Sequence, residues 1–542
     1  MRYLNFISAL FVAVSLGSCN DFLDRYPQEE LSDVSFWKSY KDVEMYVSEL
    51  YNTFPTMDVD GDINSDNAVH GIKWAAGNVS KGIYLPTDFG WSGTYGSIRI
   101  ANTVLDRAKS IDMTETELKM IEGQAYFFRA YLYFGLIQQF GDVPYIDKPL
   151  NLTDVEDITR TPKDEVYSKV MSDFDNAIDL LPEVWDEDNY GRITKGAARA
   201  MKARTALYFN EFETAAQSAK DVMDMDMYDL YDKDNTGKYA ELFWEKTERC
   251  EEVVLSVPFN APTKTHYLIM WECFPTLGWG GINPTQSLVD AFEDINGAPI
   301  TSDKTIYNPK KPFENRDPRL EVNVLHDGET IYGQTIKVAP LKSSGPTGIA
   351  QHGDATATGY YQQKWLDPNI DPQKQGGEMG KDWVIIRFAE VLLTYAEALN
   401  EISPLDDEAF KAVNRVRSRV GMPELQKTDP SKPTYCASQD DLRQRIRNEW
   451  RVEFALEGGK RQWDIRRWGI AKKVLNEPFK GLSYKIVKSP DAAPEDNGEI
   501  CILYEGDPII LEGSKYEDHN YLYPIPQSEI NLNKKLTQNP GY

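Results

Sequence analysis

Flat aromatic side chains stand in the Gly- and Pro-rich stretches of this 542-residue chain. Half of its 12 tryptophans lie where neither helical nor strand periodicity is evident: Trp74, Trp91, Trp271, Trp279, Trp365 and Trp383. A ring held on an irregular segment offers a large contact area and loses little side-chain entropy on binding. We therefore look first among these residues for a ligand-stacking platform.

Two short motifs are the best candidates. In "GWSGTYG", Trp91 lies between glycines, directly before the helix expected from "IRIANTV". In "WECFPTLGWGGINP", Trp271 precedes Trp279, and three glycines flank Trp279. Glycines also permit tight backbone turns, so a purely structural role for these rings stays open. We predict Trp91 as the first ligand-binding residue, followed by Trp279 and Trp271.

Other residues extend this candidate site with less specific signals. The additional aromatic candidates are Trp74, Tyr84, Tyr360 and Trp365. Three polar residues share the irregular segment of Trp74 and are predicted as its hydrogen-bonding neighbours: Asp66, Asn67 and Asn78. Proximity in sequence is the only argument for these three.

The N-terminus carries a different kind of chemistry. After Arg2, an apolar run over residues 6–16 is too short to span a bilayer, which needs about 20 residues, but suits a signal peptide. The following "LGSC" looks like a bacterial lipobox, which predicts a signal peptide over residues 1–18 and acylation of Cys19. The alternative is an ordinary secretory signal with an incidental cysteine.

Composition narrows the possible partners. The formal net charge of −26 argues against nucleic acid or anionic lipid as the target. The remaining cysteines form no C-x-x-C pair, which argues against a zinc site: Cys250, Cys273, Cys436 and Cys501. One disulfide among them is possible, but the sequence does not identify the pair.

Helical periodicity dominates the regions that must position these residues. A long helix is expected over residues 117–140, where Phe127, Tyr131 and Phe134 share one face. Helix pairs are expected over residues 194–223 and 385–421, the second with a "SPLDD" turn and a stop at Gly421. In the first pair, Ala203, Phe212, Ala215 and Ala219 fall near the offsets of a tetratricopeptide repeat.

A further helix is expected within residues 440–458, and short strands within 250–259 and 501–506. Segments near 55–97, 258–385 and 476–526 are too long for simple connections. We predict one mainly α domain, with repeat-like helical hairpins packed against a large irregular region, and we seek the function in that region.

Several longer phrases then resemble a known family. They include "CNDFLDRYPQEELSDVSFW", "WSGTYGSIRIANTVLDRA", "GQAYFFRAYLYFGLIQQFGDVPYI", "NRDPRLEVNVL", "IIRFAEVLLTYAEALNE", "RNEWRVEFALEGGKRQWDIRRWG" and "YLYPIPQSEINLNKKLTQNPGY". Their residues and their order along the chain resemble those of the SusD/RagB family of bacterial outer-membrane binding lipoproteins. The resemblance runs from Cys19 to Tyr542, so it implies a single SusD-like domain over residues 19–542, with an N-terminal part near 20–230 and a C-terminal part near 250–542.

This resemblance implies a fold of four repeat-like helix pairs that support an irregular binding face. It also implies a TonB-dependent, SusC-like outer-membrane transporter as partner, over which the lipoprotein acts as a lid at the cell exterior. The implied cargo is an oligosaccharide or polysaccharide that is held and not cleaved, while a minority of relatives serve peptide uptake. An aromatic platform suits a sugar, because the ring covers the apolar C–H face and polar groups meet the hydroxyls.

No cofactor, no metal ion and no catalytic activity are predicted. "DVDGDINSDN" fails as a calcium loop because Ile63 and Val69 occupy the positions of the required Gly and Glu, which leaves an irregular cation site or a solvated acidic loop. "GGEMGK" lacks phosphate-loop spacing, and the five histidines form no H-E-x-x-H motif. A surface glycoside hydrolase and a cargo-free helical scaffold remain the alternatives. The alternating Arg and Glu residues of 447–467 predict a structural salt-bridge network.

Overall fold

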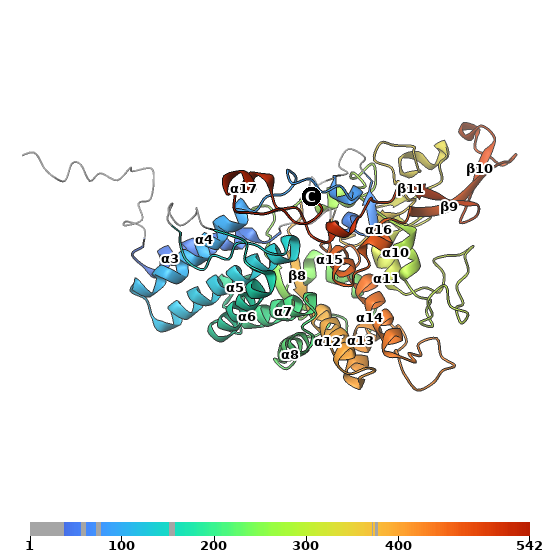
Figure 1. Ribbon diagram of the computed structural model, residues 1–542. Helices are drawn as coiled ribbons and strands as arrows, with labels where there is room; N and C mark the ends of the chain where they lie inside the picture. Colours follow the sequence, from blue (N-terminus) through green and yellow to red (C-terminus); the bar gives the residue numbers. More distant parts are fainter. Residues whose placement is uncertain (1–36, 56–60, 72–76, 151–157, 371, 374–377) are drawn as a thin grey trace, which may run out of the picture.

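The computed structural model describes residues 37–542, apart from 56–60, 72–76, 151–157, 371 and 374–377. Cys19 and Trp74 therefore lie outside the described residues, as do Asp58 and Asp60 of the acidic motif. A curved row of helices forms one layer, and a second, irregular layer of loops, short helices and small sheets covers it (Figure 1).

The helices of the first layer follow one another in chain order and contact their neighbours. Helix α5 packs against α4 and α6, α8 against α7 and α12, and α12 against α13 and α14. Their bounds are α3 Tyr40–Ser48, α4 Ser92–Arg107, α5 Glu115–Phe140, α6 Lys163–Leu180, α7 Lys195–Tyr208, α8 Phe212–Met223, α12 Phe388–Ile402, α13 Asp407–Ser418 and α14 Gln439–Glu453.

Shorter helices belong mainly to the second layer or to the connections. They are α9 Leu268–Glu272, α10 Gln286–Ala291, α11 Arg319–Asn323, α15 Lys460–Arg467, α16 Ala471–Leu475 and α17 Gln527–Leu532. In the described residues, no helix is both long enough and apolar enough to cross a bilayer.

The sequence predicts the long helices well because their local signals agree with their packing. Helix α5 begins at a capping box of Thr114 and Glu117, and it buries Phe127 and Phe134 on the face that contacts its neighbours. Helix α13 ends at Ser418, and Gly421 follows with a positive φ of 76°, which confirms the predicted stop. The expected helix pairs are α7–α8 and α12–α13.

In the C-terminal half, two of the predicted boundaries are wrong. Residues 385–387 belong to strand β8, where their side chains are buried and the backbone of Ile386 and Arg387 pairs with Leu255 and Val253 of β2. Helix α14 ends at Glu453, five residues earlier than expected, and Leu456, Gly458 and Gly459 then take positive φ values. The chain turns there and enters α15.

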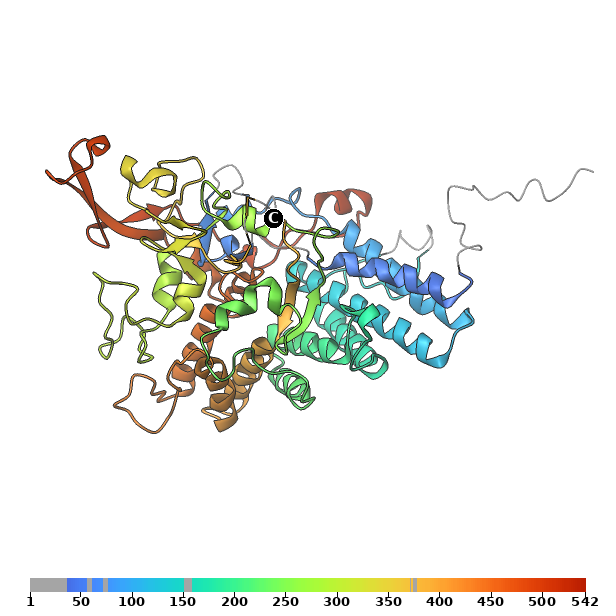
Figure 2. The ribbon, with the colours of Figure 1, turned by 180° about the vertical axis from the view of Figure 1, so that it is seen from behind.

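The strands form small sheets within the irregular layer. Their bounds are β1 Ala68–His70, β2 Val253–Val257, β3 Ile282–Pro284, β4 Val324–Leu325, β5 Thr330–Ile331, β6 Gln334–Thr335, β7 Tyr361–Gln362, β8 Trp383–Arg387, β9 Phe479–Lys488, β10 Glu499–Leu503 and β11 Asp507–Leu511. Strands β2 and β10 confirm the two predicted β segments. The sheet β10-β9-β11 projects at the end of the molecule opposite α3 (Figures 1 and 2).

Antiparallel pairing joins distant parts of the second layer. Val69 of β1 pairs with Asn283 of β3, so the segment near 55–97 lies against the segment near 258–385. Val257 of β2 pairs with Trp383 of β8 beneath them. The long irregular segments thus form one layer with its own backbone hydrogen bonds, as their length indicates.

A buried network of charged groups lies where the layers meet. The carboxylate of Glu453 pairs with the guanidinium groups of Arg319, at 3.0 Å, of Arg387, at 2.5 Å, and of Arg419. Glu449 and Glu457 extend the network to further cations. The predicted structural salt-bridge network is confirmed, but its partners come chiefly from other elements and not from neighbouring turns of the same helix.

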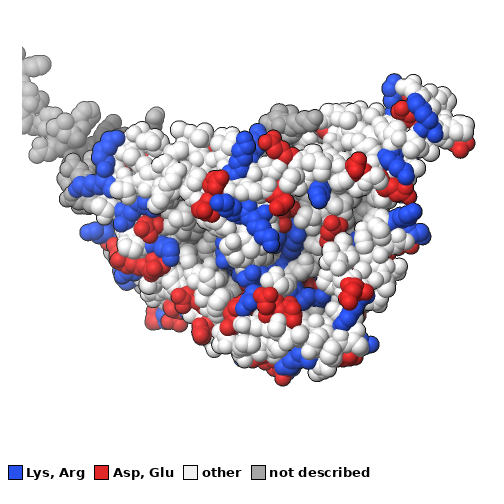
Figure 3. Space-filling model, turned by 45° about the vertical axis from the view of Figure 1, so that its right-hand side comes forward, with Lys and Arg blue, Asp and Glu red and all other residues white. Residues whose placement is uncertain are grey.

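Surface charge is unevenly spread despite the large negative total. On the face drawn in Figure 3, Lys and Arg side chains gather in a hollow near the middle of the molecule, and Asp and Glu side chains border it.

Among the described residues the cysteines are free thiols, and burial raises the pKa of Cys273 to about 12.

Candidate functional site

The structure divides the predicted aromatic residues into two groups. Trp91, Tyr84, Tyr360 and Trp365 are buried, and Trp91 has only 3% of its surface exposed. Trp279 is 43% exposed and Trp271 is half-buried. The expectation that the first group presents open rings is therefore wrong, whereas Trp279 lies on the surface as a platform requires.

Trp91 is buried because it begins a helix and packs beneath it. Helix α4 starts at Ser92, six residues before the expected start, so Trp91 takes the N-cap position. Its ring makes edge-to-face contacts with Tyr95 and Phe140, at centroid distances of 5.6 and 5.5 Å. These contacts hold the ring in the aromatic core of the helical layer.

One edge of Trp91 still lines a groove of about 1030 Å³ between α4 and α17. Tyr95, Ile98, Leu532 and Leu536 supply much of its apolar lining. Arg99, Lys148, Lys534, Lys535 and Glu529 supply charge at its sides. The groove offers contact to apolar chains more than stacking on a flat ring face.

The other buried aromatic residues are fixed by hydrogen bonds. The Tyr84 hydroxyl accepts from Arg466 at 2.7 Å, and the Tyr360 hydroxyl donates to Gln286 Oε1 at 2.6 Å. Trp365 Nε1 donates to the Leu456 carbonyl at 2.9 Å, while its ring stacks on that of Trp383 at 5.3 Å. These rings stabilise the fold.

Two of the three predicted polar residues are also structural. Asp66 is buried and paired with Arg461 at 2.8 Å and Arg451 at 3.0 Å. Burial raises the pKa of Asp66, but the two guanidinium groups more than offset this and lower it below its usual range. Asn67 Oδ1 accepts from Arg451 Nε at 2.8 Å, which fixes the same corner.

Asn78 differs, since it is exposed and donates to Asp88 at 3.1 Å.

In the acidic motif, Asp62 is buried, and its Oδ2 accepts from the backbone N–H of Leu456 at 2.6 Å and from Asn67 Nδ2 at 3.1 Å. That oxygen therefore serves to hold η3 (Gly61–Asn64) against the chain after α14.

The remaining two tryptophans lie close together: Trp271 belongs to α9, and Trp279 lies on the turn that follows it. The rings of Trp271 and Trp279 meet edge to face at a centroid distance of 5.6 Å. One helical turn before Trp271, Tyr267 is 51% exposed, and its hydroxyl lies 3.5 Å from Glu378 Oε1. We call Tyr267, Trp271 and Trp279 the aromatic platform.

Backbone hydrogen bonds hold this turn in one shape. The N–H of Trp271 donates to the Tyr267 carbonyl, and the N–H of Trp279 donates to the Met270 carbonyl, both at 2.9 Å. The N–H of Gly281 then returns to the Trp271 carbonyl at 2.8 Å. These backbone hydrogen bonds fix the positions from which the two rings project.

The glycines around Trp279 make these close contacts possible. A Cβ on Gly278 would lie 2.5 Å from the Met270 carbonyl, and one on Gly281 would lie 2.5 Å from Trp271 Nε1. Gly280 has a positive φ of 56°. The glycines of this motif therefore form the tight turn, and the Trp279 ring that they flank is exposed, so the structural interpretation and the platform interpretation both hold.

Tyr267 is the member of the platform that the sequence analysis missed. The available signal was the spacing Tyr267-x-x-x-Trp271, which places two aromatic side chains on one face of a helical turn. Helix α9 has only five residues and carries no long periodic pattern, so this spacing alone does not identify a helix.

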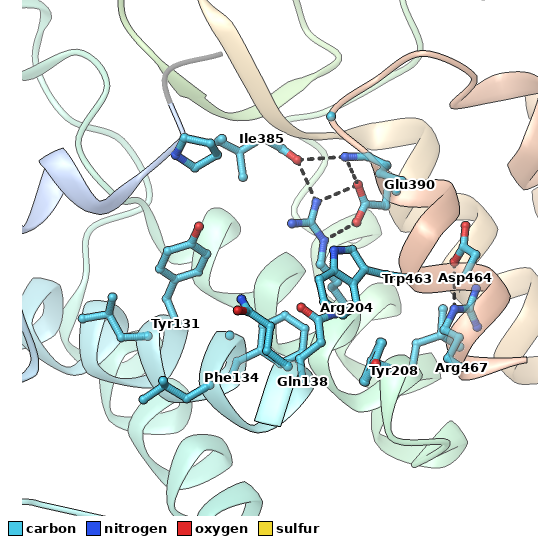
Figure 4. A pocket seen from close by; sticks show the side chains of 18 of the residues that line it. Tyr131, Phe134, Gln138, Arg204, Tyr208, Ile385, Glu390, Trp463, Asp464 and Arg467 are labelled. Atoms are coloured by element: carbon cyan, nitrogen blue, oxygen red, sulfur yellow. Dashed lines mark hydrogen bonds and ion pairs between the residues drawn. The ribbon is translucent and has the colours of Figure 1, made fainter. Parts of the chain in front are cut away.

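A second candidate lies inside the molecule, between α5, α7, α12, α15 and β8 (Figure 4). This cavity of about 390 Å³ is lined by the rings of Tyr131, Phe134, Tyr208 and Trp463. Arg204 donates to both oxygens of Glu390, at 2.5 and 2.8 Å, and to the Ile385 carbonyl at 2.7 Å.

The charges in this cavity largely neutralise one another. Burial raises the pKa of Glu390, but Arg204 and Lys460 offset it and lower the value to about 2. Asp464 accepts from Arg467 at 2.8 Å, although burial still raises its pKa. The ionised Glu390 is held by two cations, so it is poorly placed to transfer a proton to a ligand.

Comparisons with known proteins agree with this architecture. The family model described as "SusD family" matches residues 260–542, and one described as "Starch-binding associating with outer membrane" matches residues 21–207. A SusD-like protein P2 of Formosa agariphila is 25% identical over 576 residues, covering 99% of each chain. The starch-binding protein SusD of Bacteroides thetaiotaomicron is 24% identical, covering 81% of this chain and 76% of its own.

Among solved structures, a SusD-like protein from Bacteroides fragilis superimposes with a TM-score of 0.80 and 27% identity, covering 96% of this chain and all of its own. The predicted mainly α fold, with helical hairpins against an irregular region, is thereby confirmed. Since the first family model matches more than half of the sequence, the chain belongs to the SusD/RagB family.

Proposed function

We propose that this protein captures oligosaccharides or polysaccharide at the outer surface of a bacterial outer membrane and does not cleave them. The observation that carries the proposal is the aromatic platform, where Trp279 and Tyr267 expose about half of their surface within the irregular layer. Family membership and a relative named as starch-binding support a glycan as cargo.

The platform suits sugar rings for physical reasons. Edge-to-face packing sets the Trp271 and Trp279 rings at an interplanar angle of 72°, so they present two differently inclined surfaces. A curved or branched glycan could stack one sugar on each ring. Glu378 beside Tyr267 would accept hydrogen bonds from hydroxyl groups at the edge.

The remaining parts of the proposal concern location and delivery. Cys19 would carry the lipid anchor, and residues 20–36 would connect it to the folded body. A TonB-dependent, SusC-like transporter would receive the glycan, as the family resemblance implies. The family model whose description includes association with the outer membrane supports this placement.

The test is affinity electrophoresis of the chain from residue 20 onward, which keeps every described residue, through gels that contain different polysaccharides. We expect at least one glycan to retard the protein and Trp279→Ala to abolish most of the retardation. Trp185→Ala is the matched control, since Trp185 is a half-buried tryptophan beside Arg192 and lines neither the groove nor the cavity described above. Thermal melting checks that each variant folds.

Other outcomes would overturn parts of the proposal. Retardation that survives Trp279→Ala but is lost in Leu532→Glu would move the site to the groove beside Trp91. Binding of peptides without any glycan would assign a peptide cargo. Release of new reducing ends from a bound polysaccharide, abolished by Asp464→Asn, would make the protein a glycoside hydrolase.

A further inference from the structure

Three potential metal ligands meet in the irregular layer, and none of them belongs to the aromatic platform. Glu321 lies in α11, His326 follows β4, and Glu329 precedes β5. One ligand atom from each lies within 4.8 Å of the other two. His326 Nε2 is 3.3 Å from Glu321 Oε2 and 3.7 Å from Glu329 Oε2.

The imidazole of His326 is oriented as a metal-binding histidine would be. Its Nδ1 lies 3.1 Å from the Asp327 carbonyl, which can only accept a hydrogen bond, so Nδ1 carries the hydrogen. Phe313 stacks on the imidazole at a centroid distance of 3.5 Å and an angle of 11°. The ring is therefore fixed, and Nε2 points to the two carboxylates. A hydrogen bond from the second ring nitrogen to a carbonyl is usual for metal-binding histidines.

The carboxylates are held as well. Glu329 Oε2 accepts from the backbone N–H of His326 at 2.6 Å, which closes the turn between β4 and β5. Glu321 is the more exposed of the two and has no cation besides His326 within ion-pair distance in the described chain. The cluster is thus open to solvent on the side of Glu321.

We propose that Glu321, His326 and Glu329 bind a divalent first-row transition-metal ion of the Zn²⁺ class. Tetrahedral coordination with bonds of about 2.0–2.2 Å requires ligand atoms about 3.3–3.6 Å apart, which is close to the two distances from His326 Nε2 to the carboxylates. One imidazole with two carboxylates suits Zn²⁺, and solvent would supply the fourth ligand. Ca²⁺ and Mg²⁺ prefer six or more oxygen ligands and fit less well.

The location links the cluster to the rest of the irregular layer. Strands β5 and β6 continue directly from Glu329, and Gln334 of β6 accepts from the Thr276 hydroxyl at 2.7 Å. Thr276 belongs to the turn between Trp271 and Trp279. The proposal of a metal site does not rest on the proposed glycan binding, and it can be tested without a glycan.

The experiment is calorimetric titration of ZnCl₂ into the chain from residue 20 onward, prepared without a polyhistidine tag and freed of metal with a chelator. We expect one site of micromolar affinity, weakened at least tenfold by either His326→Ala or Glu321→Gln. The matched control is His352→Ala, because His352 also lies beside a carboxylate, Asp354 at 3.7 Å, and no second one among the described residues lies within ion-pair distance. The control should bind as tightly as the unmodified chain.

Cobalt provides a second readout that does not depend on heat. Co²⁺ bound by these ligands should give visible absorption bands of tetrahedral intensity, and these should be absent in Glu321→Gln. Glu321 is about half exposed, so this variant keeps the fold even if His326→Ala does not. Absence of Zn²⁺ binding at 100 μM, or equal binding by all variants, would overturn the proposal and leave an ion pair between His326 and the two glutamates.

Discussion

At the scale of single residues, two tryptophans flanked by glycine behave in opposite ways. Trp91 is buried at the start of α4, and Trp279 is exposed on a turn. The glycines are alike in sequence, but the neighbours in space differ. An aromatic residue beside glycines thus indicates a tight turn, and only the tertiary contacts decide on which side of it the ring lies.

Substitution should separate the two roles. Trp91→Ala removes a ring that packs on Tyr95 and Phe140, so we expect a loss of about 3–5 kcal/mol in the free energy of unfolding. Trp279→Ala should cost less than about 1 kcal/mol, because much of that side chain remains in water. Urea unfolding followed by circular dichroism measures both, and equal costs would contradict this assignment.

A second prediction at this scale concerns pH. The pKa of Glu390 is lowered from 4.5 to about 2, so its contribution to stability is complete above pH 4.5 and is lost as the pH falls from there to about 2. A depression of this size corresponds to about 3 kcal/mol at most. Glu390→Gln should flatten this part of the stability profile.

Denaturant unfolding at several pH values between 2 and 7 measures the profile. The control is Glu115→Gln, whose exposed carboxylate pairs with Lys119 on the same helix and should leave the profile nearly unchanged. If the free energy of unfolding of Glu390→Gln falls just as steeply between pH 4.5 and 2, then other carboxylates dominate the acid sensitivity.

At the scale of elements, the aromatic platform depends on a turn that glycines make possible. The segment from α9 to β3 holds Trp271 and Trp279 through backbone hydrogen bonds, and Gly281 lies against the Trp271 indole. The turn is fixed to β1 as well, since the N–H of Gly71 donates to the Gly281 carbonyl at 3.0 Å. Glycan binding should therefore be sensitive to the backbone of this turn.

Gly281→Ala tests this dependence without removing any aromatic ring. The added methyl would lie 2.5 Å from Trp271 Nε1, so the indole must move, and we expect weaker retardation by the glycan found for the parent protein. Gly353→Ala is the control, because among the described residues no heavy atom beyond its chain neighbours lies within 4 Å of its Cβ position. Affinity electrophoresis compares the two, and equal retardation would show that the angle between the two rings is unimportant.

At the scale of the whole molecule, buried ion pairs join the two layers. Glu453 at the end of α14 meets Arg319 of α11, Arg387 of β8 and Arg419 after α13. All four side chains are almost fully buried. Removal of one partner from such a site leaves buried charges uncompensated, which is more costly than the loss of a surface pair.

We expect Glu453→Gln to reduce the free energy of unfolding by about 3–5 kcal/mol, because three guanidinium groups lose a shared carboxylate. Asp224→Asn, which removes an exposed pair with Lys220 on the surface of the helical layer, should change it by less than about 0.5 kcal/mol. Urea unfolding distinguishes the two, and a similar small effect for both would mean that the network adds little to stability.

The sequence by itself determined several of the long helices and the family, although α3 and α6 were not among the expected helices. Periodicity, caps and the stop at Gly421 act within a few residues, so the long helices can be recognised without knowledge of their neighbours. Local patterns extend the helices wrongly over residues 385–387 and beyond Glu453, because pairing with β2 and the buried network of charged groups override local preference there.

Only the tertiary structure decided which candidate residues face solvent. Asp66 and Tyr84 looked like surface groups of a polar loop, but Arg461 and Arg466 from almost 400 residues later in the chain bury them. Tyr267 and the group of Glu321, His326 and Glu329 became visible only once the irregular layer was folded. Exposure depends on contacts between distant segments, and no local pattern of residue types encodes those contacts.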